Sequence, residues 1–289
     1  MISALHAAAA TAPWWFWPLS LFVVCFFLGI IAVPAGVGGG VVFVPIVAAF
    51  FPFHIDFVRG AGLLVALSGA LAAGPRMLES GLANLRLALP PALIASAASI
   101  AGAMIGLILP ESILQVALGA TILGIMAIMA LVKNDDLPKI EAPDPISRAL
   151  GLHGVFVDGA TGESHAWQAH RTPVGLVLFV GIGIVAGMFG LGAGWANVPV
   201  LNLVMGVPLK VAAGTSSFVI SPAAALVYLN QGGLLPMIAA PSVAGMMLGS
   251  VIGAHVLHSV PARKVRRLVL ALMFFAGLRA LAKGMGWWA

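Results

Sequence analysis

Apolar stretches long enough to cross the hydrocarbon core of a membrane recur along this chain from Trp14 to Trp288. A core of about 30 Å needs roughly 20 consecutive apolar residues in a helix. Of the 289 residues, 61% are hydrophobic and only 8% are charged, whereas soluble domains are roughly 25% charged. The sequence therefore predicts an all-α polytopic membrane protein.

The charged and reactive residues exclude several classes of protein. The 14 lysines and arginines are scattered through short loops and do not line one face, so we expect a lipid bilayer and no nucleic acid as a partner. Cys25 is the only cysteine, which excludes an intrachain disulfide and a thiolate metal cluster. His153, His165 and His170 match no standard zinc spacing. We expect no metal and no cofactor.

The chain carries an internal repeat. When it is shifted by 154 residues against itself, positions 29 to 62 align with positions 183 to 216 without a gap, and nine aligned residues are identical. Chance would give roughly three identities in so biased a composition. Farther along, GAMIG at 102 to 106 resembles GSVIG at 249 to 253. Each half is therefore predicted to be one folding unit; the alternative is that two glycine-rich spans match by accident.

Each half contains five apolar segments. The first half has them at about 17 to 35, 39 to 51, 58 to 75, 86 to 109 and 112 to 132, and the second at about 173 to 189, 194 to 206, 211 to 229, 234 to 258 and 264 to 283. The second segment of each half is too short to cross the core alone, and a glycine cluster precedes it. The first two segments are therefore predicted to form a hairpin or a discontinuous helix.

The distribution of lysine and arginine indicates how the two halves are oriented. If the first two segments of each half formed one crossing, these residues would show no bias between the two sides of the membrane. If they form a hairpin, one side collects eleven of the 14, as the positive-inside rule prefers. We therefore predict an inverted repeat, with residues 1–132 as the first transmembrane repeat, 133–171 as a cytoplasmic insert and 172–289 as the second transmembrane repeat.

The insert is the one segment that resembles a soluble protein. It begins with the polar, proline-containing run KNDDLPKIEAPDP, and two short β-prone runs then flank the turn sequence DGATG. This pattern predicts a small β-hairpin.

The paired glycine motifs are the strongest functional signal. They are GVGGGVVFVP at 36 to 45 and GLGAGWANVP at 190 to 199. A helix that begins at about Gly39, and another at about Ala193, would point free backbone N–H groups into the membrane interior and bind an anion without a buried lysine or arginine. The alternative is close helix packing by small residues. The candidate anion-binding residues of the motifs are Gly38, Gly39, Gly40, Gly192, Ala193 and Gly194.

Polar residues close to the motifs in sequence are further candidates. The run GTSS at 214 to 217 is expected at the start of the helix after the second motif, where its hydroxyls either donate to an oxyanion or bond back to their own helix. Arg59 flanks the third segment and either attracts the anion or extends its side chain to the membrane surface. The polar substrate-binding candidates are Asn197, Thr215, Ser216, Ser217, Ser68 and Arg59.

These motifs together resemble the TauE/SafE family of sulfite exporters, also called TSUP permeases. The resemblance rests on the first glycine motif, its second copy with the following NLVMGVPLKVAAGTSS, and the intervening GVFVDGATGE and AHRTPVG. It implies a bacterial inner-membrane protein that transports sulfite, thiosulfate or organosulfonates, mostly as an exporter. Gly38 to Gly40, Gly192, Gly194, Thr215 and Ser216 fall on the family's motif positions. The chain departs from it at Ala193, where many members have glycine, and in GTSS, where others have ATS.

The expected function is export of a small sulfur-containing anion across the membrane. A transporter or channel for another small anion, such as a carboxylate, fits the same residues. An intramembrane enzyme is disfavoured because the spans contain no GxSxG and no HExxH sequence. A coupled proton or cation and a homodimer are compatible with the sequence.

Overall fold

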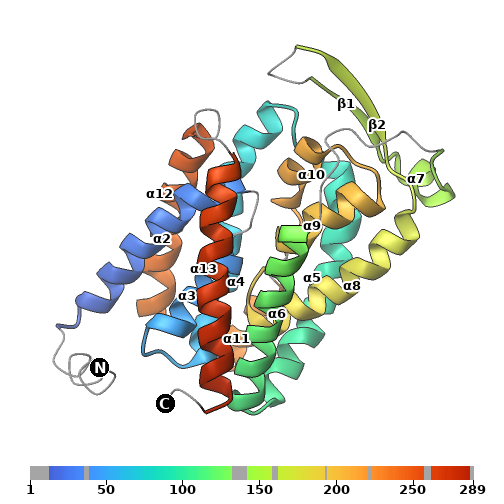
Figure 1. The fold of residues 1–289 in the computed structure, drawn as a ribbon. Helices are drawn as coiled ribbons and strands as arrows, with labels where there is room; N and C mark the ends of the chain where they lie inside the picture. The colour runs from blue at the N-terminus through green and yellow to red at the C-terminus, as the bar shows by residue number, and fades with distance from the viewer. Residues whose placement is uncertain are drawn as a thin grey trace.

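The computed structural model describes residues 13–35, 39–131, 142–157, 162–192, 194–220, 223–256 and 262–286. These residues form a helix bundle with one small sheet at its end (Figure 1). In chain order the elements are α2 (Phe16–Ala35), α3 (Gly39–Phe50), α4 (Ile55–Glu79), α5 (Leu85–Ile108), α6 (Glu111–Leu131), α7 (Pro145–Leu150), β1 (His153–Val157), β2 (Ser164–Gln168), α8 (Thr172–Phe189), α9 (Gly194–Pro199), the π-helical turn η1 (Val200–Val204), α10 (Leu209–Ser216), α11 (Ala223–Asn230), α12 (Pro236–Val256) and α13 (Ala262–Gly284).

Several helices have the length and composition of membrane spans. Among the described residues, α4, α5, α6, α8 and α12 each contain an apolar stretch of 18 residues or more, and α2 and α3 are shorter apolar helices. The prediction of an all-α polytopic membrane protein is confirmed.

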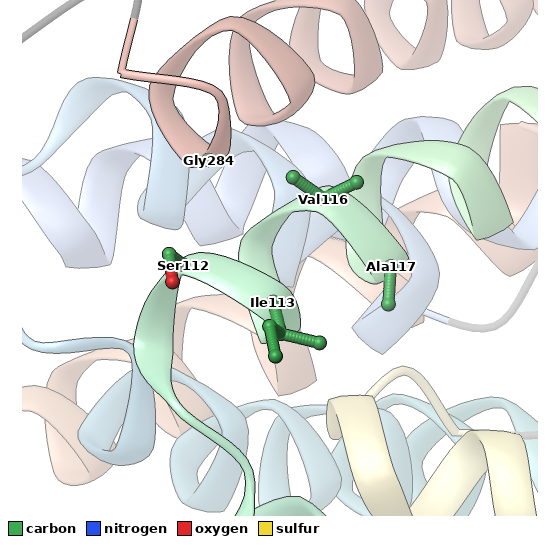
Figure 2. A pocket seen from close by; sticks show the side chains of 5 residues that line it. All are labelled: Ser112, Ile113, Val116, Ala117 and Gly284. Carbon is green, nitrogen blue, oxygen red and sulfur yellow. The ribbon is translucent and has the colours of Figure 1, made fainter.

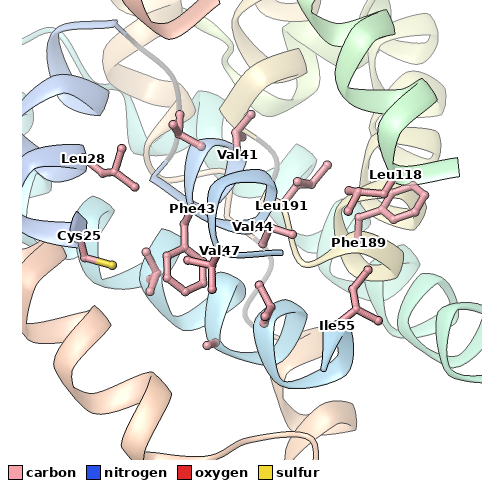
Figure 3. Close-up of a cluster of buried hydrophobic side chains, with 14 of the residues drawn as sticks. Cys25, Leu28, Val41, Phe43, Val44, Val47, Ile55, Leu118, Phe189 and Leu191 are labelled. Atoms are coloured by element: carbon pink, nitrogen blue, oxygen red, sulfur yellow. The ribbon is translucent and has the colours of Figure 1, made fainter. Parts of the chain in front are cut away.

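The short helix α3 is enclosed by protein. Its residues from Gly39 to Pro45 are buried, as are Val47 and Ala49. Figure 3 shows Phe43, Val44 and Val47 within a cluster of buried apolar side chains to which Phe189 and Leu191 also belong. Because protein surrounds α3, a 12-residue helix that cannot cross the membrane alone is tolerated at this depth.

Two helix pairs are held together by close glycine contacts. The helix α12 lies along α2, and α5 lies along α8. A Cβ on Gly253 of α12 would lie 2.8 Å from Ile30 O of α2, and a Cβ on Gly106 of α5 would lie 2.8 Å from Met188 O of α8. The resembling sequences GAMIG and GSVIG thus lie on α5 and α12, and each packs against another helix through its glycines.

The direction of each pair follows from the order of its contacts. Along α12, Gly245 approaches Phe22 and Gly253 approaches Ile30, so α12 and α2 are parallel. Along α5, Gly102 approaches Ile184 and Gly106 approaches Met188, so α5 and α8 are also parallel. The helices α6 and α13 are antiparallel, because Gly119 approaches Leu281 whereas Gly284 approaches Val116.

The insert forms a small unit at one end of the bundle (Figure 1). Strands β1 and β2 are antiparallel, with His153 opposite Gln168 and Val157 opposite Ser164, and the sequence DGATG lies between them along the chain. Asp144 joins the insert to the bundle, because one carboxylate oxygen accepts hydrogen bonds from Ile146 N and Ser147 N of α7, and the other accepts one from Thr172 N at the start of α8.

The third segment of the second half differs from its prediction. The sequence predicts one apolar segment at 211 to 229, but the structure has two short helices, α10 and α11. The sequence carries Pro222 between the two helices, and proline has no backbone N–H with which to continue the hydrogen bonds of one uninterrupted helix. Thr215 and Ser216 therefore end the helix α10, and the expectation that they begin a helix is wrong.

Candidate functional site

The two glycine motifs meet on α4. A Cβ on Gly40, in the first turn of α3, would lie 2.7 Å from Leu191 O and 2.8 Å from Gly62 O. Gly192 has a left-handed backbone with φ of +66°, and a Cβ there would lie 2.9 Å from Ala66 Cβ. Backbones from both motifs thus approach the stretch of α4 from Gly62 to Ala66 so closely that side chains are excluded.

A helix begins at each motif. The first residue of α3 is Gly39 and the first residue of α9 is Gly194. Both glycines are buried. The first N–H groups of a helix have no partner within it, so these positions are where backbone donors become free. Gly38 and Ala193 lie outside the described residues.

The glycines also allow close packing, which was the alternative role. A Cβ on Gly39 would lie 2.7 Å from Met246 Cε and 2.8 Å from its Sδ. The side chain of Met246, in α12, therefore covers the first residue of α3. The described contacts therefore account for the lack of side chains at Gly39, Gly40 and Gly192 by packing, and an anion at these residues is a proposal.

The hydroxyl candidates are engaged within the protein. Thr215 Oγ1 accepts a hydrogen bond from Asn84 N at 3.1 Å, just before α5. The Ser216 hydroxyl donates to Ala213 O at 2.8 Å, and the Ser68 hydroxyl donates to Val65 O at 2.9 Å. Ser217, the residue after α10, is half-buried. The serine bonds match the alternative in which hydroxyls bond back to their own helix.

Asn197 fastens α9 to the break between α10 and α11. Its Nδ2 donates to Ser216 O at 3.3 Å and to Val219 O at 2.8 Å. The side chain has no exposed surface, and its Oδ1 has no hydrogen-bond partner. Buried amide oxygens are rarely left without a donor.

Arg59 is buried and does not extend to the membrane surface. Only 1% of its surface is exposed. Its Nη1 donates to Gly106 O at 3.1 Å and to Met188 O at 2.9 Å, in the last turns of α5 and α8, where the helix dipole favours a positive charge. Its Nη2 pairs with Asp56 Oδ1. The possibility that Arg59 snorkels is therefore wrong.

Two partners of Arg59 were not expected from the sequence. Tyr228 of α11 lies under the guanidinium, with Arg59 Cζ 5.3 Å from the ring centroid, and its hydroxyl donates to Gly187 O at 2.9 Å. Asp56 lies three residues before Arg59 on α4. That spacing, and the fact that Tyr228 is the only tyrosine in the chain, were the available signals.

A groove between α6 and α13 lies away from these residues. It has a volume of about 310 Å³ and is lined by Ser112, Ile113, Val116, Ala117 and Gly284 (Figure 2). None of the candidate site residues lines it. Within the described residues, no group of three or more His, Cys, Asp or Glu side chains is placed to hold a metal ion.

Apolar helices that enclose two glycine-rich helix starts are a feature of membrane transport proteins, and the comparison of sequences agrees with this class. Residues 21–280 match the sequence model of the family described as Sulfite exporter TauE/SafE, so the chain belongs to the TauE/SafE family of membrane transporters.

One curated protein supports the same class. The chain is similar to "Probable membrane transporter protein YunE" of Bacillus subtilis (strain 168), with 26% identity over 145 residues. The match covers 49% of this chain and 52% of that protein, so it spans about half the length of this relative. No solved structure matches the chain.

Proposed function

We propose that the protein exports a small sulfur-containing anion, either sulfite, thiosulfate or an organosulfonate, and holds it where α3 and α9 begin. The observation that carries this proposal is the meeting of both glycine motifs on α4 at Gly62 to Ala66. Backbone N–H groups at the starts of buried helices favour an anion. Membership of the TauE/SafE family supports a sulfur oxyanion as the substrate, and we propose no enzymatic activity.

Inverted halves would place these helix starts on opposite sides of one site. In this proposal α2 to α6 form the first repeat, and α8 to α13 form the second. The first helix of each half then lies parallel to the fourth helix of the other, as α2 with α12 and α8 with α5. The last helices, α6 and α13, pack antiparallel on each other. A two-fold axis in the membrane plane relates such pairs, which supports the inverted repeat.

We propose that the insert lies in the cytoplasm of a bacterium and that the helices lie in its inner membrane. The hairpin of β1 and β2 lies at the same end of the bundle as α10 (Figure 1). This end also holds Arg86, next to the start of α5, and Lys210 in α10. Positive charge at one end supports a cytoplasmic location for that end.

Anion flux into proteoliposomes tests the function. Sulfite, thiosulfate, sulfoacetate and lactate are compared, and we expect saturable flux of the sulfur anions and none of lactate. Gly40→Ala should abolish the flux because its Cβ meets the Leu191 and Gly62 carbonyls, whereas Gly181→Ala, where nothing lies within 4 Å, should retain it. Ser216→Ala, in α10 next to Asn197 of α9, is a milder change.

Two outcomes would contradict the proposal. Lactate flux without sulfite flux would show that the protein transports carboxylates. Unchanged sulfur-anion flux in Ser216→Ala and in correctly folded Gly40→Ala would show that the glycine motifs do not hold the anion. Size-exclusion profiles in detergent check the folding of each variant.

A further inference from the structure

Arg59 lies beside the residue that opens the second glycine motif. Its backbone lies directly against Gly190, where a Cβ would come within 2.5 Å of Arg59 Cα. Gly190 opens the second motif and follows the last residue of α8. The guanidinium itself reaches Met188 O, two residues before Gly190, so the charge lies next to the start of the second motif.

A buried arginine needs a counter-charge, and Asp56 supplies it. Taking an isolated charge out of water costs far more free energy than a single hydrogen bond returns. The carboxylate that contacts Arg59 in the described residues is that of Asp56. Any anion that takes over the guanidinium therefore competes with Asp56 for the same positive charge.

One N–H donor of the Arg59 guanidinium has no acceptor in the described part of the chain. Its Nε is buried and has no hydrogen-bond partner, although Nη1 and Nη2 are engaged. A buried guanidinium N–H without an acceptor is costly, and an acceptor that binds in another state of the protein would remove this cost.

A chain of titratable groups connects the pair to the surface. His54 Nδ1 lies 3.3 Å from Asp56 Oδ2, and His54 Nε2 lies 3.6 Å from Glu111 Oε2 at the start of α6. The side chains of Asp56, His54 and Glu111 are 32%, 50% and 46% exposed, so water reaches all three. Within the described residues, Tyr228 is a further titratable group in contact with Arg59, and its hydroxyl donates to the backbone carbonyls of Gly187 and Met188.

We propose that Asp56 and Arg59 couple anion transport to the movement of one proton, an inference that rests on the proposed function. In the resting pair the Asp56 carboxylate neutralises Arg59. When a substrate anion binds the guanidinium through the free Nε–H, Asp56 leaves and takes up a proton from water, which reaches its side chain directly as well as through the neighbouring His54. The cluster gains one anion and one proton, so its net charge is unchanged for a monovalent anion and becomes more negative by one for a divalent anion such as thiosulfate. When the anion leaves, Asp56 releases the proton and pairs with Arg59 again.

The number of protons moved per anion tests the coupling. Proteoliposomes are loaded with a pH-sensitive dye, and thiosulfate is the first probe because it takes up no proton near neutral pH. In the wild type we expect one proton for each anion. In Asp56→Asn the amide Oδ1 still accepts from Arg59, so anion should move downhill without a proton signal. Sulfite can also serve as the probe if the number of protons moved per anion is compared between the wild type and Asp56→Asn, because any proton that sulfite itself carries is the same in both.

Matched variants separate the coupling role from a structural one. Asp56→Glu should restore proton movement, whereas His54→Gln and Glu111→Gln should slow it without changing the proton to anion ratio. Arg59→Gln should lose anion flux. Size-exclusion profiles and thermal unfolding confirm that each variant is folded.

Each outcome decides between the two proposals. Anion flux with the same proton ratio in wild type and Asp56→Asn, including a ratio of zero in both, overturns the coupling and leaves the exporter intact. If His54→Gln is the variant that loses proton movement and Asp56→Asn keeps it, the histidine carries the proton and the proposed role of Asp56 is overturned. If folded wild type moves none of the sulfur anions, the proposed function fails and the coupling fails with it.

Discussion

Gly62 is required by the backbone that packs against it. A Cβ at this position would lie 2.5 Å from Gly190 O and would also strike Val44. Gly62→Ala should therefore lower the stability by about 1 to 3 kcal/mol, as overpacking does. Gly124 of α6 is the matched control, because nothing lies within 4 Å of its Cβ, and alanine there should be neutral or stabilising by up to about 1 kcal/mol. Thermal unfolding in detergent measures both, and equal shifts would contradict the prediction.

Asp144 should make the attachment of the insert sensitive to acid. Burial alone would raise the pKa of its carboxyl, but the N–H groups of Thr172, Ser147 and Ile146 outweigh it and hold the pKa below its ordinary value. The stabilisation is therefore present above the unfolded-state pKa of about 4 and is lost as the pH falls through the lower folded-state pKa.

The matching variant is Asp144→Ala, which removes a cap and should cost about 1 to 2 kcal/mol at neutral pH. Proteolysis between α7 and α8 should become faster in the wild type below about pH 4. In Asp144→Ala it should be fast already at neutral pH. A variant that resists protease as well as the wild type does would show that Asp144 does not hold the insert.

At the scale of the element, Asn197 determines where α9 meets the broken segment. Asn197→Leu removes both donors and leaves Ser216 O and Val219 O unpaired, which should cost about 1 to 3 kcal/mol for a buried group. Asn197→Asp should be worse, because a carboxylate placed against two carbonyls is a buried charge without a partner. Asn230→Leu, at the exposed end of α11, should change the unfolding temperature little. Similar stability of Asn197→Asp and Asn230→Leu would exclude this role.

The elements differ in how well the sequence predicts them. Apolar length and glycine clusters are local signals, so the start of α3 at Gly39 and the long helices α4, α5, α6, α8 and α12 were within reach. The break after Ser216 was not predicted because apolar residues continue on both sides of it, and Pro222 lies several residues beyond the point where α10 ends. The partners of Arg59 were missed because Gly106 O and Met188 O belong to distant helices, and no local pattern encodes such contacts.

At the scale of the whole molecule, the pairing of helices and the distribution of charge favour the same orientation. The first helix of each half lies parallel to the fourth helix of the other half. This pairing fits an inverted repeat, in which each half has an odd number of crossings. The insert then lies on the side that collects eleven of the 14 lysines and arginines, which the positive-inside rule places in the cytoplasm. The connection between α11 and α12 should lie on the other side.

Single cysteines in a Cys25→Ser background test this orientation, since Cys25 is the only cysteine of the chain. Ser164 of β2 and Gln231 after α11 are both exposed and lie on opposite sides of the membrane in the proposal. A membrane-impermeant maleimide should label Ser164→Cys only in inside-out vesicles and Gln231→Cys only in right-side-out vesicles. Labelling of both from the same side would contradict the inverted repeat, because the crossings between them would then be even. If Ser164→Cys were labelled only in right-side-out vesicles and Gln231→Cys only in inside-out vesicles, the inverted repeat would stand. The insert would then face the periplasm, against the positive-inside rule.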